Sequence, residues 1–205
     1  MKAIQAAEPR LVLASASSAR RAVLAAAGLN FEATAAAVDE AAIKESAQAE
    51  AIPPEDAALM LADAKAAAIA RRDPDALVIG CDQLLVCEGR WFDKPADAAA
   101  ARAHLQALRG RKHLLVTAIV CHRHGRRIWQ HVASPRLTMR AVSDEFLDAY
   151  LDAEAAHVTH SVGAYRIEGP GAQLFSKVEG EHAAILGIPL LPLLDFLRQH
   201  RVLLG

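Results

Sequence analysis

The chain has 205 residues, 53% of them hydrophobic, and a formal net charge of −1 at pH 7. This balanced charge argues against binding of polymeric nucleic acid, and no window reaches the roughly 18 uninterrupted apolar residues that a transmembrane helix needs. The N-terminal segment MKAIQAAEPR lacks the long apolar region of a signal peptide, so we expect a soluble cytoplasmic protein with no membrane partner. The cysteines, three in number, lack metal-ligand spacing and are expected to be reduced, mostly buried thiols.

The first informative segment covers residues 10–24, with the sequence RLVLASASSARRAVL. It predicts a strand at residues 11–13, a Ser/Ala elbow, and a helix with Arg20 and Arg21 in its first turn. Ser15 is one of three serines whose hydroxyl could cap that helix. Hydroxyls, guanidinium groups and the unpaired N–H groups of a helix start make a cradle for a polyphosphate. The alternative is an ordinary capped helix with solvated arginines.

The remaining elements follow from apolar runs and turn signals. Further strands are predicted at residues 31–35, 76–81, 84–87, 114–121 and 128–139. Helices are predicted at residues 55–72, 95–109, from Ser143 onward as N-cap, and at 189–200. His124-Gly125, between two apolar runs, indicates a hairpin turn. Strands that alternate with helices and are followed by a hairpin predict an α/β fold with a mixed sheet.

The second informative segment runs from residue 77 to Pro95. Its apolar run at 77–79 predicts a buried central strand that leads into Asp82. A carboxylate at the end of such a strand is well placed in a cleft, where it could activate water or bind Mg²⁺. The alternative is an aspartate that caps a turn. Lys94, which precedes Pro95, could meet a phosphate or be a solvated lysine.

Other polar residues have weaker signals. Asp39-Glu40 adds two acids after the strand at 31–35. Lys65 lies on an alanine-rich helix, where simple exposure is the more common outcome. His122 and His124 have a spacing of two at a hairpin tip, which favours exposed turn residues over metal ligands.

The third informative segment, GAYRIEGPG at residues 163–171, contains three glycines around one aromatic residue and one acid. Such a backbone turns tightly or approaches a ligand closely. Tyr165 could pack on a nucleobase and Glu168 could hydrogen-bond to its edge. The alternative is a glycine-rich connector to the next strand.

Taken in order, these segments resemble the Maf family of nucleoside triphosphate pyrophosphatases. The resemblance covers nearly the whole chain and rests on LASASSARRAVL, VDE, AKA, GCDQ, the KP of DKP, GRKHLLVT, GAYRIEGPGAQLF and VEGEHAAILGIPL. It implies a single Maf-like domain over residues 1–205, of the inosine-triphosphate-pyrophosphatase-like type. In that fold a mixed twisted sheet is flanked by helices, and two lobes surround a central cleft. The implied activity is Mg²⁺-dependent hydrolysis of a nucleoside triphosphate substrate to the monophosphate and pyrophosphate.

The resemblance also implies roles for individual residues. Asp82 matches the catalytic base and, together with Glu40, the ligands of the divalent metal. The residues that match substrate-binding positions are Ser15, Arg20, Arg21, Lys65, Lys94 and Glu168.

Several positions depart from the branch of the family that prefers dTTP and UTP. These are Gln83, Glu168 and the pair His160-Ser161, and they resemble the branch that acts on 7-methyl-GTP. An acid at the base edge suits guanine, which offers N–H donors. The open alternatives are a pyrophosphatase that prefers dTTP and UTP, and a non-catalytic nucleotide-binding regulator of cell division. A homodimer is left open as the assembly.

Overall fold

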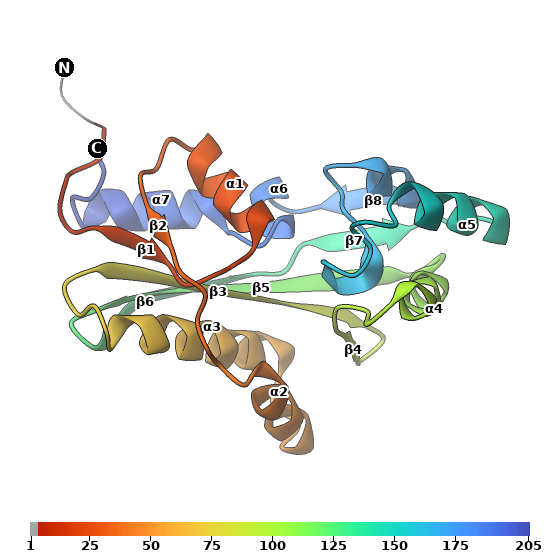
Figure 1. Ribbon diagram of the computed structural model, residues 1–205, viewed down its shortest axis with the longest axis horizontal. Helices are drawn as coiled ribbons and strands as arrows, with labels where there is room; N and C mark the ends of the chain where they lie inside the picture. Colours follow the sequence, from red (N-terminus) through yellow and green to blue (C-terminus); the bar gives the residue numbers. More distant parts are fainter. Residues whose placement is uncertain (1–3) are drawn as a thin grey trace. The chain divides into compact units, whose positions relative to one another are not determined.

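The structure is a computed structural model that describes residues 4–205 (Figure 1). Its strands are β1 (Leu11–Leu13), β2 (Glu32–Ala33), β3 (Leu77–Cys87), β4 (Arg90–Phe92), β5 (Lys112–Arg123), β6 (Arg126–Ala133), β7 (Arg136–Met139) and β8 (Phe175–Glu179). Its α-helices are α1 (Ser18–Ala26), α2 (Glu40–Ala49), α3 (Pro54–Ala70), α4 (Ala98–Leu108), α5 (Asp144–Ala153), α6 (His182–Ile185) and α7 (Leu190–Gln199). Two short 3₁₀ helices, η1 (Val162–Ala164) and η2 (Pro170–Leu174), precede β8. Within residues 4–205, no helix has the length and apolar character that crossing a membrane requires.

The strands form a mixed sheet with the order β2-β1-β3-β5-β7-β8, in which β4 also pairs with β3 and β6 with β5. β1 pairs in parallel with both β2 and β3. Strand β4 pairs antiparallel with β3, both β6 and β7 pair antiparallel with β5, and β8 pairs antiparallel with β7. The predicted α/β fold with a mixed sheet flanked by helices is therefore confirmed.

The chain divides into two compact units. Unit 1 contains the residues up to Gln83, together with Thr117–Ala133 and Glu181–Gly205, whereas unit 2 contains Leu84–Val116 and Ser134–Gly180. Strands β3 and β5 each contribute one part to each unit. The single domain expected over residues 1–205 stays a prediction.

In unit 1 the two faces of β3 have different neighbours. Leu77, Ile79 and Cys81 alternate along the strand and belong to one buried apolar cluster with residues of α1 and α7. Helix α3 lies on the opposite side of these strands (Figure 1). Because side chains alternate between the faces of a strand, residues 78, 80 and 82 face α3. The predicted central strand and the buried cysteines are thus confirmed, since Cys81, Cys87 and Cys121 are all buried and free.

Unit 2 has its own core between α4, α5 and the strands of its part of the sheet. The fully buried side chains there include Leu105, Leu108, Leu137 and Leu147. Helix α5 begins as predicted, since Ser143 is its N-cap and accepts a hydrogen bond from the backbone N–H of Phe146.

Several details of the predicted elements are wrong, including the strand end expected at Asp82, which lies within β3. The runs at 76–81 and 84–87 form one strand, β3, and the run at 128–139 breaks into β6 and β7 around Pro135, which has no N–H to donate to the sheet. Helix α4 begins at Ala98 because Asp97, not Pro95, caps it. Strand β4 and helix α2 were not predicted.

Candidate functional site

Arg20 is held in place by three hydrogen bonds within unit 1. Its Nη1 donates to the carbonyl of Cys81 at 2.9 Å and to Ser15 Oγ at 3.4 Å, and its Nε donates to the carbonyl of Gly187 at 3.1 Å. A Cβ at Gly187 would lie 2.8 Å from Arg20 Nε, and this glycine has a φ of +96°. These hydrogen bonds fix the guanidinium group through Nε and Nη1, and they do not involve Nη2.

The elbow before α1 gathers the other predicted phosphate ligands. Ser15 is buried and accepts a hydrogen bond from the backbone N–H of Ser17 at 3.2 Å. Ser17 in turn is the N-cap of α1 and accepts from the N–H of Arg20. Arg21 lies next to Arg20 on the exposed side of the helix. The structure therefore brings Ser15 and Arg20 together and leaves Arg21 at the surface.

A second cluster joins Lys65 on α3 to two carboxylates. Lys65 Nζ lies 2.5 Å from Asp82 Oδ1 and 2.9 Å from Glu40 Oε1. The side chains of Lys65 and Asp82 are only 10% and 6% exposed, whereas that of Glu40 is 44% exposed. The expectation that Lys65 is an exposed lysine is wrong, because it lies on the face of α3 that packs against the sheet. Asp82 Oδ2 is buried and has no hydrogen-bond partner among residues 4–205.

Gly80 determines how close α3 comes to β3. A Cβ at Gly80 would lie 2.2 Å from the carbonyl oxygen of Ala62 and 2.8 Å from Cβ of Ala66. Gly80 and Asp82 share one face of the strand, since they are two residues apart. The missing side chain at position 80 therefore lets the backbone of α3 approach the strand and brings Lys65 within contact of Asp82.

The acid pair fits a divalent cation that also binds phosphate. Magnesium is usually held by one or two carboxylates together with phosphate oxygens and water. Glu40 and Asp82 contact the same ammonium group, and one buried oxygen of Asp82 has no partner in the described part of the chain. Within the described part of the chain, no group of three or more His, Cys, Asp or Glu residues could hold a metal ion. The donor set therefore suits a metal that a substrate shares, rather than a metal enclosed by protein ligands alone.

The remaining predicted site residues, Lys94 and Glu168, belong to unit 2 and are exposed. Glu168 lies in the loop between η1 and η2, which an ion pair between Arg166 and the buried Glu154 stabilises. Arg166 Nε lies 2.7 Å from Glu154 Oε2, and Arg166 Nη2 donates to Glu154 Oε1 at 3.0 Å. The hydrogen bonds from Arg166 hold the pKa of Glu154 below its ordinary value. The loop that presents Glu168 is therefore fixed at its base.

Tyr165 is not available to stack on a nucleobase, so that expectation is wrong. Its ring is buried against Phe175, with 4.8 Å between the ring centroids, and its hydroxyl lies 2.8 Å from Nε2 of His113. Burial raises the pKa of Tyr165 and lowers that of His113 to about 4. Both rings belong to the core of unit 2.

Gln83 forms a structural anchor within unit 1. Its Nε2 donates to Thr117 Oγ1 at 2.7 Å and to the carbonyls of Ala184 and Ile185, each at 3.1 Å. Thr117 Oγ1 also donates to the carbonyl of Ala184. These bonds tie β3 and β5 to α6, so the amide group of Gln83 is engaged by the protein itself.

The two histidines of the hairpin have different environments. His124 is exposed in the turn, as expected. His122 is buried, and its Nε2 lies 2.8 Å from Oδ1 of Asp63 on α3, so its predicted exposure is wrong. The reason is that His122 still belongs to β5, two residues before the turn.

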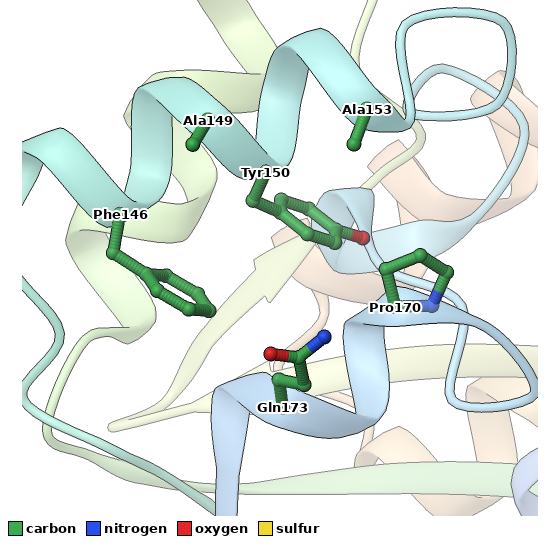
Figure 2. Close-up of a pocket in the computed structure, with 6 residues that line it drawn as sticks. All are labelled: Phe146, Ala149, Tyr150, Ala153, Pro170 and Gln173. Carbon is green, nitrogen blue, oxygen red and sulfur yellow. The ribbon is translucent and has the colours of Figure 1, made fainter.

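A surface depression in unit 2 does not resemble a triphosphate site. Its volume is about 170 Å³. It lies between α5 and η2, whose side chains line it in Figure 2. Its lining residues are Phe146, Ala149, Tyr150, Ala153, Pro170 and Gln173. None of them carries a charge at neutral pH, since burial raises the pKa of Tyr150 to about 12. The depression therefore offers no counter-charge to phosphate.

Three positioning residues escaped the sequence analysis. Gly80 and Gly187 allow the close approaches described above, and a glycine inside a strand is a general sign of such an approach. Glu181 accepts hydrogen bonds through Oε1 from the N–H groups of Leu190 and Leu191, at 3.1 and 3.0 Å. Glu181 thereby caps α7 although it lies nine residues before the helix start. A local sequence pattern cannot indicate a cap at that separation.

Comparison with known proteins shows which family this chain resembles over nearly its whole length. The Maf-like protein family matches residues 10–200. The chain is 55% identical over 194 residues to a nucleoside triphosphate pyrophosphatase of Granulibacter bethesdensis, which covers 95% of this chain and 98% of that protein. It is 51% identical over 197 residues to a nucleoside triphosphate pyrophosphatase of Rhodospirillum rubrum, covering 96% of this chain and 98% of that protein. It is also 48% identical over 192 residues to a 7-methyl-GTP pyrophosphatase of Rhizobium meliloti, covering 94% of this chain and 96% of that protein. The chain belongs to the Maf family.

Proposed function

We propose that this protein is a hydrolase that converts nucleoside triphosphates to nucleoside monophosphates and pyrophosphate. The names of its relatives support this activity. The observation that carries the proposal is the pair of neighbours Cys81 and Asp82. The carbonyl of Cys81 fixes Arg20, whereas the side chain of Asp82 contacts Lys65. Two adjacent residues within β3 thus connect a candidate phosphate ligand with a candidate base.

In the proposed reaction a water molecule attacks the α-phosphorus. The bond between this phosphorus and the oxygen that bridges it to the β-phosphate breaks, and pyrophosphate leaves. Asp82 orients the water and takes its proton on Oδ2, the oxygen that has no hydrogen-bond partner among residues 4–205. Positioning and charge neutralisation supply most of the acceleration in such transfers.

The cationic residues neutralise the phosphate chain. Arg20 contacts the phosphate chain through Nη2, because its hydrogen bonds to the protein use Nε and Nη1. Ser15 adds a hydroxyl group next to the Arg20 guanidinium. Lys65, Arg21 and Lys94 supply further positive charge, and the roles of Arg21 and Lys94 rest on the family resemblance. A bound Mg²⁺, held by Glu40 and Asp82, would stabilise negative charge on the phosphate oxygens.

For the base we propose guanine, with 7-methyl-GTP as the leading candidate substrate. Glu168 is exposed on a loop fixed by Arg166 and Glu154. A carboxylate can accept hydrogen bonds from N1–H and the exocyclic amine of guanine. Methylation at N7 adds a positive charge to the purine, which a nearby carboxylate also favours. The name of the Rhizobium meliloti relative supports this choice.

The proposal is tested by product analysis with GTP, 7-methyl-GTP, UTP and dTTP in the presence of Mg²⁺. We expect the monophosphate and intact pyrophosphate as primary products. In water labelled with ¹⁸O, the label should enter the monophosphate, because the attack is at the α-phosphorus. Nucleoside diphosphate with labelled orthophosphate would instead reveal a γ-phosphatase. Binding of nucleotides without any product would indicate the non-catalytic regulator.

A further inference from the structure

The ammonium group of Lys65 lies where the two candidate metal ligands converge. Its Nζ contacts one oxygen of Asp82 and one of Glu40, at 2.5 and 2.9 Å. These are the two carboxylates that a shared divalent cation would need. The lysine therefore already supplies positive charge at the place that the metal would take.

Burial makes this pairing tight. Lys65 and Asp82 are almost fully buried, so water screens their attraction weakly. An unpaired buried carboxylate would be costly, and Lys65 pairs with Asp82 through Oδ1. A divalent cation bound to the same oxygens would lie within a few ångströms of the ammonium group and would be repelled by it.

The lysine can nevertheless leave without any change in the fold. Its helix is fixed against β3 by the contact of Gly80 with Ala62, so α3 stays in place. The ammonium is carried on a flexible four-carbon stem with three rotatable donors. A triphosphate, with several negative charges, offers that ammonium another partner.

We propose that the ammonium group of Lys65 takes the place of the metal between Glu40 and Asp82 and so keeps divalent metal out until a nucleotide binds. When the ammonium group turns to the triphosphate, it releases both carboxylates to the metal. This inference rests on the proposed function, since it takes the triphosphate as the ligand that draws Lys65 away. Metal and nucleotide then bind together, and each raises the affinity for the other by the same factor.

The test measures binding of Mn²⁺ alone, without nucleotide, by the loss of the free Mn²⁺ signal in electron paramagnetic resonance. Wild-type protein should bind weakly, and Lys65→Met should bind about tenfold or more tightly, because one repelling charge is removed. Lys65→Arg keeps the charge and should restore weak binding. Lys177→Met, which removes an exposed lysine in unit 2, is the matched control and should behave as wild type.

Thermal unfolding gives a second readout. Adding Mn²⁺ should raise the Tm of Lys65→Met and leave those of the wild type and Lys65→Arg nearly unchanged. Equal Mn²⁺ affinities for the wild type and Lys65→Met would overturn the proposal. So would micromolar binding of Mn²⁺ by wild-type protein without nucleotide, a result that needs no variant to fold.

The two proposals fail in different ways. A protein that releases pyrophosphate but binds Mn²⁺ tightly without nucleotide would refute metal exclusion by Lys65 and leave the pyrophosphatase activity intact. A protein that excludes Mn²⁺ until Lys65 is replaced, yet releases no pyrophosphate from any nucleotide, would refute the activity instead.

Discussion

At the scale of single residues, Asp82 carries the most specific prediction. Asp82→Asn keeps the shape of the side chain and removes both its charge and its basicity. We expect turnover to fall by about 10²-fold or more, while nucleotide binding measured without divalent metal is retained. Steady-state kinetics and a binding titration would measure the two effects, with Asp75→Asn, an exposed acid of the same unit, as the control. Retention of more than about a tenth of the wild-type rate would exclude Asp82 as the general base.

Arg20 should distinguish nucleotides by the length of their phosphate chain. Loss of a hydrogen bond to a charged group costs about 1.5–3 kcal/mol, which corresponds to about tenfold to a hundredfold in affinity. We expect Arg20→Ala to weaken triphosphate binding by this factor and monophosphate binding much less, as measured by calorimetry with non-hydrolysable analogues. Arg126→Ala changes an exposed arginine in the hairpin and serves as control. Equal losses for both ligands would place Arg20 outside the phosphate site.

Glu168 should set the choice of base. Against O4 of uracil its carboxylate would face another acceptor, and such a mismatch costs about 1–3 kcal/mol. We therefore expect the wild type to prefer guanine nucleotides over UTP and dTTP, and Glu168→Gln to shift that preference toward uracil and thymine. Competing nucleotides would be compared by kcat/KM, with Glu145→Gln, an exposed acid on α5, as the control. A wild-type preference for UTP, or no shift in the variant, would show that Glu168 does not read the base.

At the scale of elements, the contact between α3 and β3 should be intolerant of a single methyl group. Gly80→Ala would place Cβ against the carbonyl of Ala62, which is backbone and cannot move alone. Overpacking of this kind costs about 1–3 kcal/mol, and displacement of α3 should also separate Lys65 from Asp82. We expect a lower Tm and a lower kcat than in the wild type.

A second substitution makes this prediction sharper. Ala66→Gly removes the side-chain atom nearest to the added methyl group, the Cβ at 2.8 Å, but leaves the backbone O of Ala62 and the backbone N of Ala66 in place. The double variant should therefore recover little of the lost activity. Full recovery would show that the spacing depends on side chains of α3 and not on its backbone.

The elements also show what the sequence could predict. Strand β1, the caps of α1 and α5, and α7 follow from local patterns, and all were predicted within a few residues. Helix α2 was missed because Asp39-Glu40 was interpreted as a pair of acids, although Asp39 is its N-cap and accepts from the N–H of Ala42. Strand β4 was missed because it follows the turn Glu88-Gly89. Glu88 adopts a positive φ there, and glutamate is not a residue type that indicates such a turn.

For the candidate site, the sequence indicated which residues matter more readily than how they are arranged. The family motifs pointed to Lys65 and Asp82, and composition favoured an exposed lysine. Only the packing of α3 on β3 shows that the two side chains are in contact. Tyr165 is the opposite case, because its place in a glycine-rich motif suggested a ligand contact, whereas its ring fills the core of unit 2. Tertiary contacts between distant segments decide such cases, and a local pattern does not record them.

At the scale of the whole molecule, His113 makes stability depend on pH. Burial lowers its pKa from 6.5 to about 4, so the unfolded chain binds a proton more readily than the folded protein. The resulting stability is present above the unfolded pKa and is lost as the pH falls through the folded value. We expect the free energy of unfolding to decrease by about 3 kcal/mol between pH 7 and pH 4 from this group.

Chemical denaturation at several pH values would measure this dependence. His104 also has a lowered pKa and adds to the slope in the same window, so the comparison must isolate His113. His113→Phe should be less stable at pH 7, because Tyr165 loses its hydrogen-bond partner, and should show a flatter profile between pH 6.5 and pH 4. An unchanged slope in this variant would assign the pH dependence to other groups.

The alternation along β3 has a consequence for how this chain can change its length. Cys81 belongs to the cluster with α1 and α7, whereas Asp82 belongs to the face of α3. One residue added or lost between positions 77 and 82 would turn the carboxylate toward the apolar side and a neighbouring side chain toward Lys65. Adding or losing two residues would return the Asp82 carboxylate to the side of α3. The site therefore tolerates only even changes in the number of residues in this part of β3. Natural or engineered insertions that preserve the site should fall in turns such as Glu88-Gly89 and His124-Gly125.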